Sequence, residues 1–451
     1  MQFEISKSLI EKIEYLIEEQ NDQELLSHLG DMHHADIAEI LDELSLDEAT
    51  YIIKLLDSEK TAEVLMEIDE DDRDKLLDNL SPQEIADEIA EMDTDDATDI
   101  ISNLSLPLKE EVLSNLEDRT HVQDIVELMR YDENSAGGLM AKELIKVNEN
   151  WSVTGCMEEM RSQGEYVTRV HSIYVVDNKG KLKGRLSLKD LITAPRTASI
   201  EDIYIENVDY VDVHTPGEEV ARIMQKYDLE AIPVIDEIGR LVGRITVDDI
   251  IDFIREEADK DYQMAAGISE DVDADDSIWQ LTRARLPWLV LALFGGFLAV
   301  LVAKQYDSAL EKYKSLFFFM PLIVAMAGNV GVQSSAIIVQ GLAKGTLTGS
   351  VWKRLVKEVG LNIINGIVLS IILFTGAYFI LDGGDISLPL TMSISLIVVV
   401  LMASLVGTFV PIMLDKYNID PAIATGPFIT TSNDIFGLLI FFAIAKFMLG
   451  F

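Results

Sequence analysis

The stretch Asp420–Phe451, DPAIATGPFITTSNDIFGLLIFFAIAKFMLGF, decides how this chain is built. Between residues 422 and 445 every side chain is apolar, small or weakly polar except those of Asn433 and Asp434. About 20 such residues are enough to cross a bilayer as a helix. An ionisable side chain inside such a helix costs at least about 2.5 kcal/mol. Asp434 is therefore the first candidate for a functional residue.

Asp434 shares a helix face with two smaller residues. Gly426, Thr430 and Asp434 recur at every fourth position, so they form one stripe of the predicted helix. Pro427 lacks a backbone N–H, which frees a carbonyl one turn earlier. A small residue, a hydroxyl and a carboxylate on one face are typical of the wall of a cation path. The structural alternative is a helix-packing stripe with a protonated or hydrogen-bonded Asp.

The second half of the chain contains four more apolar spans. We expect the five spans at about 286–303, 316–343, 359–381, 386–414 and 421–446. Pro321, Gly328 and Gly331 weaken the second span and predict a broken helix. Asn329 and Gln333 share a face of this span, and amides within a bilayer pair between helices or line water.

The two halves of the chain differ sharply in charge. The formal net charge is −42; residues up to Ser277 include 25 Lys and Arg against 70 Asp and Glu, and the remainder 11 against 8. Basic residues flank the first span and fill the second loop, whereas the third loop carries Asp382 and Asp385. The positive-inside rule therefore predicts a multi-pass protein of the cell membrane with its acidic half in the cytosol and its C-terminus outside. So acidic a surface argues against nucleic-acid binding.

Residues 1–130 predict an acidic all-α domain with an internal repeat. Short helices are expected to start every twelve residues, at the N-cap residues Ser45, Asp57, Asp69, Ser81, Asp93 and Ser105. Glu48 and Glu84 each follow a Ser by three residues and complete capping boxes. Apolar pairs between the caps indicate that the helices stack into a small superhelix.

Residues 137–255 contain two similar units, assigned to 137–200 and 201–255. Each has the order helix, strand, turn, strand, helix, as in EEVARIMQKY followed by AIPVIDEIGRLVGRITVDDII. The pattern G-R-x-S/T-x-x-D occurs in both, beginning at Gly184 and Gly243. The pair resembles tandem cystathionine-β-synthase (CBS) domains, which are regulatory modules that often bind adenine nucleotides such as ATP.

The CBS resemblance makes Lys189 and Asp190 candidates for nucleotide binding. The structural alternative is that Ser187 and Thr246 only cap the helices that follow them.

An acidic helix is predicted to continue beyond the second unit, with the sequence DDIIDFIREEADKD at 248–261. Like charges four residues apart, such as Asp248 and Asp252, repel each other. Bound cations or a basic neighbour would stabilise such a helix; the alternative is a plain exposed acidic face. Residues 256–277 are interpreted as the end of this connecting helix and a linker.

The segments PLIVAMAGNVGVQ and DPAIATGPFITTSND resemble the MgtE family of magnesium channels and transporters. The resemblance extends over essentially the whole chain, because the acidic helical domain, the CBS-like pair and the acidic helix follow in that family's order. It implies a multidomain protein: an all-α superhelical N-domain, an α/β CBS pair, a connecting plug helix and a five-helix transmembrane domain at 278–451.

The resemblance also implies a homodimer with the ion path on its two-fold axis. Asp434 matches the intramembrane Asp of the family's pore. The residues expected along the path are Asp434, Asn329, Gly328, Thr430, Gly426 and Gln333. The expected metal ligands, most of them at regulatory sites, are Asp434, Asp95, Asp99, Glu218, Asp228, Asp248, Asp249, Asp252, Glu257 and Asp261.

Magnesium fits these residue types. Mg²⁺ prefers oxygen ligands, sheds water reluctantly and binds through one or two carboxylates. The predicted spans contain no Cys or His, which argues against zinc or copper. Oxygen ligands are also compatible with Co²⁺, Mn²⁺ or Ca²⁺, and with either a channel or a coupled transporter.

Regulation is expected to follow from charge. Cytosolic Mg²⁺ bound to the N-domain, CBS pair and plug helix would neutralise their repulsion and hold the pore closed. Another class of function is a membrane-anchored nucleotide sensor that transports nothing. An enzyme is not expected, because an intramembrane aspartyl protease needs two carboxylates that share a proton, and the spans contain no second deep carboxylate.

Overall fold

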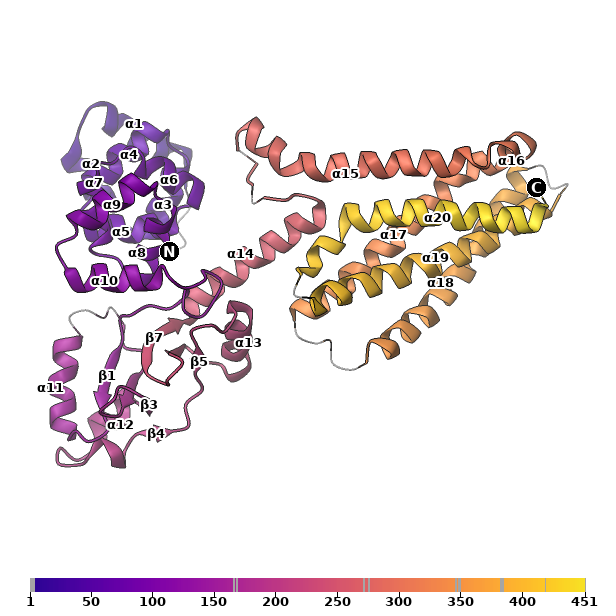
Figure 1. Ribbon diagram of the computed structural model, residues 1–451. Coiled ribbons are helices and arrows are strands. Elements are labelled where there is room, and N and C mark those ends of the chain that lie inside the picture. Colours follow the sequence, from indigo (N-terminus) through magenta and orange to yellow (C-terminus); the bar gives the residue numbers. More distant parts are fainter. Residues whose placement is uncertain are drawn as a thin grey trace. The chain divides into compact units, whose positions relative to one another are not determined.

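The computed structural model describes residues 5–450 without residues 165, 166, 168, 271, 275, 345, 346, 348, 349, 382–384 and 418, and without the side chains of 308 and 309. Asp382 of the predicted third loop therefore lies outside the described residues. The chain forms two compact units, Met1–Phe253 and Ile254–Phe451 (Figure 1).

The first unit begins with a stack of short helices. They are α1 (Lys7–Glu18), α2 (Asp22–Leu29), α3 (His34–Asp42), α4 (Leu46–Leu55), α5 (Ser58–Glu67), α6 (Glu70–Leu77), α7 (Pro82–Ile89), α8 (Thr94–Asn103), α9 (Leu106–Asn115) and α10 (Arg119–Leu128). Helices two apart in sequence pack together, as α3 does on α5 and α5 on α7. Their buried aliphatic side chains, including Ile37, Leu65 and Ile85, form one continuous core. The predicted superhelical stack is confirmed.

The predicted helix starts are confirmed as well. The N-caps of α4 to α9 are Ser45, Asp57, Asp69, Ser81, Asp93 and Ser105. In the two capping boxes, the Ser45 N–H donates to the Glu48 carboxylate at 3.0 Å and the Ser81 N–H donates to the Glu84 carboxylate at 2.6 Å. Each Glu thereby satisfies a backbone donor that has no partner inside the helix.

Two small sheets complete the first unit. The first contains β1 (Ile145–Asn148), β2 (Ile173–Val176), β3 (Leu182–Leu186) and β4 (Ile205–Glu206), and the second β5 (Val211–Asp212), β6 (Ala231–Ile235) and β7 (Leu241–Thr246), each in that order. The helices of this region are α11 (Val153–Gln163), α12 (Leu188–Thr193), η1 (Ile200–Asp202) and α13 (Gly217–Tyr227).

The two sheets have the same connections. α11 joins the parallel strands β1 and β2, and α13 joins β5 and β6. Strands β2–β3 and β6–β7 form antiparallel hairpins whose turns include Gly180 and Gly239 with positive φ. The predicted helix, strand, turn, strand, helix order is confirmed. β1 and β5 were not predicted, because four and two residues are too few for a strand pattern to stand out.

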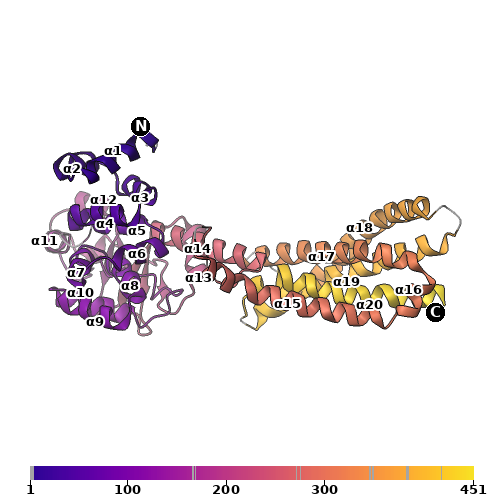
Figure 2. The same cartoon turned by 90° about the horizontal axis from the view of Figure 1, so that it is seen from above.

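α14 (Val247–Ala266) leads from the first unit into the second. There follow α15 (Ile278–Lys304), α16 (Asp307–Lys312), α17 (Lys314–Ala343), α18 (Val351–Ile380), α19 (Ser387–Lys416), η2 (Pro421–Ala424) and α20 (Gly426–Leu449). Within the described residues, five segments are long and apolar enough to cross a membrane, namely α15, α17, α18, α19 and η2 with α20. The five predicted spans are confirmed. α17, α19 and α20 pack against one another, α15 packs on α20, and α18 packs on α19 (Figure 2).

The prediction of a break in the second span is wrong. α17 is continuous across Pro321, Gly328 and Gly331. A Cβ placed on Gly331 would lie 1.9 Å from the Asn433 side chain, so this glycine serves close helix packing. The interruption lies in the last span, where Thr425 is extended between η2 and α20.

Candidate ion path and acidic cluster

α20 carries the predicted polar stripe. Gly426 opens the helix with a φ of 46°, and its carbonyl accepts a hydrogen bond from Thr430 Oγ1 at 2.9 Å. Gly426, Thr430 and Asp434 are all partly buried. The next stripe is fully buried in helix contacts and consists of Ile429, Asn433 and Gly437. The polar stripe therefore lies at the edge of the packed interior, where a carboxylate and a hydroxyl can meet a hydrated ion.

α17 brings one predicted partner to this stripe. A Cβ placed on Gly328 would lie 3.3 Å from Thr430 Cγ2, so the missing side chain lets the two helices approach closely. Asn329 and Gln333, in contrast, are exposed on the single chain and lie outside the α17–α20 contact. The described chain thus places Gly328 beside the polar stripe and the two amides on a free surface of α17.

Sequence reasoning missed hydrogen bonds that polar side chains make between and within the membrane helices. Ser334 Oγ donates to Glu358 Oε1 at 2.6 Å, and Asn362 Nδ2 donates to the same oxygen at 3.0 Å. Ser335 Oγ donates to the Ala424 carbonyl at 3.1 Å, which ties α17 to η2. Serine in an apolar span gives no clear signal, because its hydroxyl can equally bond to its own helix.

A second candidate site lies in the first unit, where α8 begins. One oxygen from each of Asp93, Asp95 and Glu143 lies within 4.8 Å of the others. Thr94 fixes the arrangement, because its N–H and hydroxyl donate to Glu143 Oε2 at 3.2 and 2.9 Å, and its Oγ1 accepts from the Lys142 N–H at 2.8 Å. Carboxylate oxygens so arranged are the ligands that Mg²⁺ and Ca²⁺ prefer.

Burial and mutual repulsion disfavour the ionised form of these carboxylates. Burial, with the neighbouring Glu143, raises the pKa of Asp93 to about 6. Burial, with the charge of Asp249, raises the pKa of Asp96 to about 8. The pKa of Asp95 lies well above its ordinary value because of burial and the charges of Asp96 and Asp249. Crowded carboxylates of this kind take up either protons or a cation.

Asp249 connects the cluster to the second CBS-like unit. Its Oδ2 accepts hydrogen bonds from the N–H of Thr246 at 3.0 Å and from the Thr246 hydroxyl. A cationic side chain lies nearby: Arg244 is 5% exposed, and its Nη2 is 3.8 Å from Asp93 Oδ2. The structure therefore brings the predicted residues Asp95 and Asp249 together. One half of the predicted capping arrangement is therefore present, in which the Asp249 side chain accepts from the Thr246 N–H.

Sequence reasoning did not select Asp93, Asp96 and Glu143. Asp93 was interpreted as an N-cap only, and Glu143 lies outside any helix or strand. The run DTDD at 93–96 is a signal that could have drawn attention to this helix start.

The other predicted metal ligands lie on more open surfaces. Asp99, Glu218, Asp228, Asp248 and Asp252 are exposed, while Glu257 and Asp261 are partly exposed on α14. Glu257 has a partner already, since its carboxylate lies 3.3 Å from Lys260 Nζ.

The predicted nucleotide residues lie at the start of α12. The Lys189 N–H donates to Ser187 Oγ at 3.2 Å, which confirms that Ser187 caps this helix. The Lys189 side chain is exposed, and Asp190 is partly exposed.

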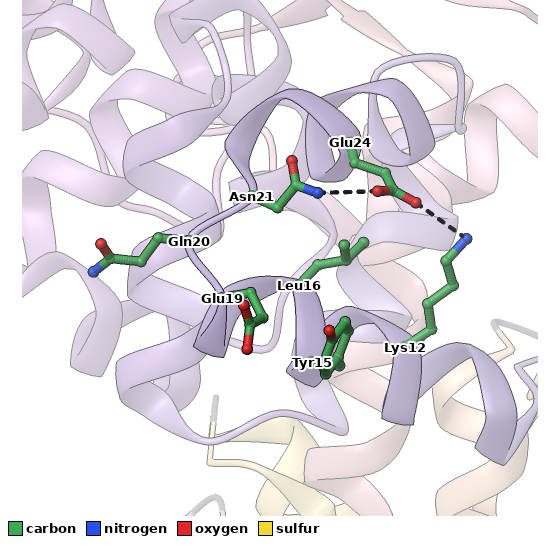
Figure 3. Close-up of a pocket in the computed structure, with 7 residues that line it drawn as sticks. All are labelled: Lys12, Tyr15, Leu16, Glu19, Gln20, Asn21 and Glu24. Carbon is green, nitrogen blue, oxygen red and sulfur yellow. Dashed lines mark hydrogen bonds and ion pairs between the residues drawn. The ribbon is translucent and has the colours of Figure 1, made fainter.

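A surface pocket between α1 and α2 contains none of the predicted site residues (Figure 3). Its lining residues are Lys12, Tyr15, Leu16, Glu19, Gln20, Asn21 and Glu24. Glu24 accepts a hydrogen bond from Asn21 at 3.0 Å and lies 3.9 Å from Lys12 Nζ, so its charge is already balanced.

Known proteins match each part of this chain. The family model of the MgtE intracellular N domain matches residues 32–134, the CBS domain matches 136–196 and 200–256, and MgtE, described as a divalent cation transporter, matches 320–444. The magnesium transporter MgtE of Thermus thermophilus is 36% identical over 74% of this chain and 74% of its own length. The chain belongs to the MgtE family. MgtE of Bacillus subtilis is likewise 36% identical, over 70% of both chains.

Solved structures of MgtE cytosolic regions resemble the first half of the chain. The soluble part of a magnesium transporter matches with a TM-score of 0.51 and 30% identity, over 56% of this chain and 99% of that one. The cytosolic domain of the Mg²⁺ channel MgtE in complex with ATP matches with a TM-score of 0.51 and 33% identity, over 54% and 99%. These matches confirm the predicted fold class, and the MgtE relatives are transporters and channels, not enzymes.

Proposed function

We propose that this protein carries Mg²⁺ across the cell membrane along a path lined by the polar stripe of α20. The observation that carries the proposal is a carboxylate, Asp434, partly exposed beside Thr430 and Gly426 in a unit of five apolar helices. One carboxylate and a hydroxyl suit an ion that keeps most of its waters. The MgtE relatives are named magnesium transporters, which supports Mg²⁺ over other divalent ions.

The path is completed by a second copy of the chain. Asn329 and Gln333 are amides on a membrane helix, yet they are exposed on the single chain. A homodimer whose two-fold axis follows the path would give them water or a partner, as polar groups in a bilayer require. The acidic half lies in the cytosol and the C-terminus outside, in accordance with the basic second loop.

Uptake of Mg²⁺ into proteoliposomes tests this function. The wild type should take up Mg²⁺, and Asp434→Asn, which keeps the shape of the side chain, should reduce the rate at least about tenfold, the effect of losing one charged ligand contact. Asp415→Asn makes the same chemical change at an exposed position of α19 and should leave uptake unchanged. Normal uptake by Asp434→Asn would remove Asp434 from the path.

In the same proposal, Mg²⁺ bound to the acidic residues regulates transport along the path. Cytosolic Mg²⁺ binds the carboxylates of Asp93, Asp95 and Glu143 and the nearby Asp249, and further ions bind along α8, α13 and α14. The ligands proposed there are Asp99, Glu218, Asp228, Asp248, Asp252, Glu257 and Asp261. Support comes from the raised pKa values of Asp93, Asp95 and Asp96, which are caused by burial and by repulsion between neighbouring carboxylates. Bound ions stabilise the closed state, and their loss opens the path.

Varying the Mg²⁺ concentration on the cytosolic side tests this regulation. Wild-type uptake should fall as cytosolic Mg²⁺ rises, whereas Asp95→Asn combined with Asp249→Asn should need a higher concentration for the same inhibition. Equal inhibition of both proteins would contradict a regulatory role for this cluster.

The CBS pair binds an adenine nucleotide in this proposal, with Lys189 and Asp190 among its contacts. The support is the related cytosolic domain, which was solved in complex with ATP. Titration calorimetry of the full chain with ATP should show binding that weakens in Asp190→Ala. Unchanged affinity in this variant would exclude Asp190 from the site.

A further inference from the structure

Asn433 is a polar side chain in a close helix contact of the membrane unit. It is 0% exposed and lies on the buried stripe of α20. Its Nδ2 donates to the Ala327 carbonyl of α17 at 3.4 Å. Its Oδ1 has no hydrogen-bond partner among the residues that the structure describes.

Two glycines create the space for this amide. A Cβ on Gly331 of α17 would lie 1.9 Å from Asn433 Nδ2. A Cβ on Gly407 of α19 would lie 2.4 Å from the Gly331 carbonyl oxygen. The backbones of α17 and α19 therefore touch at Gly331 and Gly407, and the amide of α20 fills the space beside them.

Packing alone does not account for an amide here. Leucine has the same branching and the same number of side-chain heavy atoms, although its methyl groups are bulkier, and it would leave no buried acceptor unpaired. A buried amide oxygen without a donor destabilises a folded protein, and an apolar group of the same shape removes that cost. Unlike leucine, the amide fixes the orientation of its side chain, because a hydrogen bond to a backbone carbonyl depends on angle as well as distance.

The orientation of the Asn433 side chain affects the orientation of the next residue, Asp434. Successive residues of an α-helix are about 100° apart around its axis. Holding Asn433 against the Ala327 carbonyl therefore fixes the rotation of α20 at this level, and with it the direction in which Asp434 leaves the helix.

We propose that Asn433 is a positioning residue of the ion path, which acts by fixing the rotation of α20 so that the Asp434 carboxylate faces the ion. This inference rests on the proposed role of Asp434 in Mg²⁺ transport. Residues that orient a metal-binding side chain typically contribute about 10- to 100-fold to metal affinity or activity.

The first test replaces Asn433 by leucine. Asn433→Leu removes the unpaired oxygen, and its melting temperature reports whether the bulkier side chain is accommodated. Its half-saturating Mg²⁺ concentration in proteoliposome uptake should rise about 10- to 100-fold. An uptake curve identical to that of the wild type would overturn the proposal.

A size exchange separates positioning from packing. Gly331→Ala should push the amide aside, and Asn433→Ala should leave a cavity, so each single variant should lower the melting temperature. In the double variant the new methyl group occupies the vacated space, and the melting temperature should recover. Uptake should stay low if the amide positions Asp434. Recovery of uptake together with stability would show that Asn433 only fills space.

Asp434→Asn, measured in parallel, distinguishes failure of this inference from failure of the proposed function. If Asp434→Asn transports normally, the proposed path itself is wrong and the positioning role falls with it. If Asp434→Asn is inactive while Asn433→Leu matches the wild type, the path stands and only the positioning role is wrong.

Discussion

At the residue scale, Glu88 of α7 shows the effect of burial on a carboxylate outside the acidic cluster. It is 9% exposed, and its Oε2 has no hydrogen-bond partner in the described part of the chain. Burial, with repulsion from Asp87, raises its pKa to about 7. A hydrogen bond with Ser58 acts in the opposite direction and is weaker than burial. Between pH 4.5 and about 7 the folded protein therefore holds a proton that the unfolded chain releases.

This pKa predicts how stability depends on pH. The folded pKa of Glu88 lies above its ordinary value of 4.5, so the free energy of unfolding should fall as pH rises from 4.5 to about 7. Glu88→Gln should remove this part of the slope and stabilise the protein at pH 8 by about 1–3 kcal/mol. Thermal unfolding at pH 5 and pH 8 measures both effects. Glu91→Gln, an exposed neighbour, is the control, and an unchanged slope in Glu88→Gln would exclude burial as its cause.

At the scale of elements, the end of α14 meets the start of α20. α14 ends at Gly267, whose φ of 84° allows the Ile268 N–H to donate to the Gln263 carbonyl at 3.0 Å. This arrangement is a Schellman cap, which favours glycine. Gly426 also has a positive φ, and a Cβ placed on it would lie 2.2 Å from the Ala265 carbonyl oxygen. α14 and α20 therefore touch through a glycine that no other residue replaces without strain.

Replacing Gly426 by alanine should destabilise the protein. Gly426→Ala adds strain of about 1–2 kcal/mol from the left-handed backbone, and the clash with a backbone oxygen adds to it. The melting temperature of the full chain should fall, and inhibition by cytosolic Mg²⁺ should weaken because α14 is displaced. Gly296→Ala on α15 is the matched control: nothing lies within 4 Å of its Cβ position, so improved helix propensity should raise the melting temperature. A higher melting temperature in both variants would contradict the close contact at Gly426.

The same scale shows which features a sequence can predict. The starts of α4 to α9 were predictable because an N-cap is a local interaction within four residues. The continuity of α17 was not predictable, because Gly331 is needed for close packing against Asn433 of α20 and Gly407 of α19, which are distant in sequence. The acidic cluster was only half predictable, since Thr94 and Glu143 are 49 positions apart and meet only through the fold. Asp95 and Asp249 were identified through family resemblance, and Glu143 had no such support.

At the scale of the whole molecule, acidic residues outnumber basic ones by 78 to 36. An excess of this size attracts cations to the whole surface of the acidic half, so weak binding of Mg²⁺ is expected across that surface. The cluster at Asp93, Asp95 and Glu143 differs from that background through its buried position and raised pKa values. A measurement on the whole protein must therefore distinguish Mg²⁺ bound at the buried site from Mg²⁺ attracted to the surface. The number of protons released on binding makes this distinction.

Mg²⁺ binding to this cluster should release protons. The pKa of Asp93 is about 6 and that of Asp96 about 8, both above the ordinary 3.8. From pH 3.8 up to these raised pKa values, the folded protein therefore holds protons that compete with the metal. Without Mg²⁺, the free energy of unfolding should fall as pH rises from 3.8 towards 8, and bound Mg²⁺ should offset that loss. The apparent Mg²⁺ affinity of the full chain should accordingly increase from pH 6 to pH 8.

Calorimetry in two buffers with different ionisation enthalpies counts the released protons. Asp96→Asn should reduce their number, whereas Asp47→Asn, the same change at an exposed position of α4, should leave it unchanged. Surface screening alone would release almost no protons, because exposed carboxylates are already ionised at pH 7. Binding without proton release, at an affinity that does not vary with pH, would place the bound Mg²⁺ on the surface and exclude the buried cluster as the regulatory site.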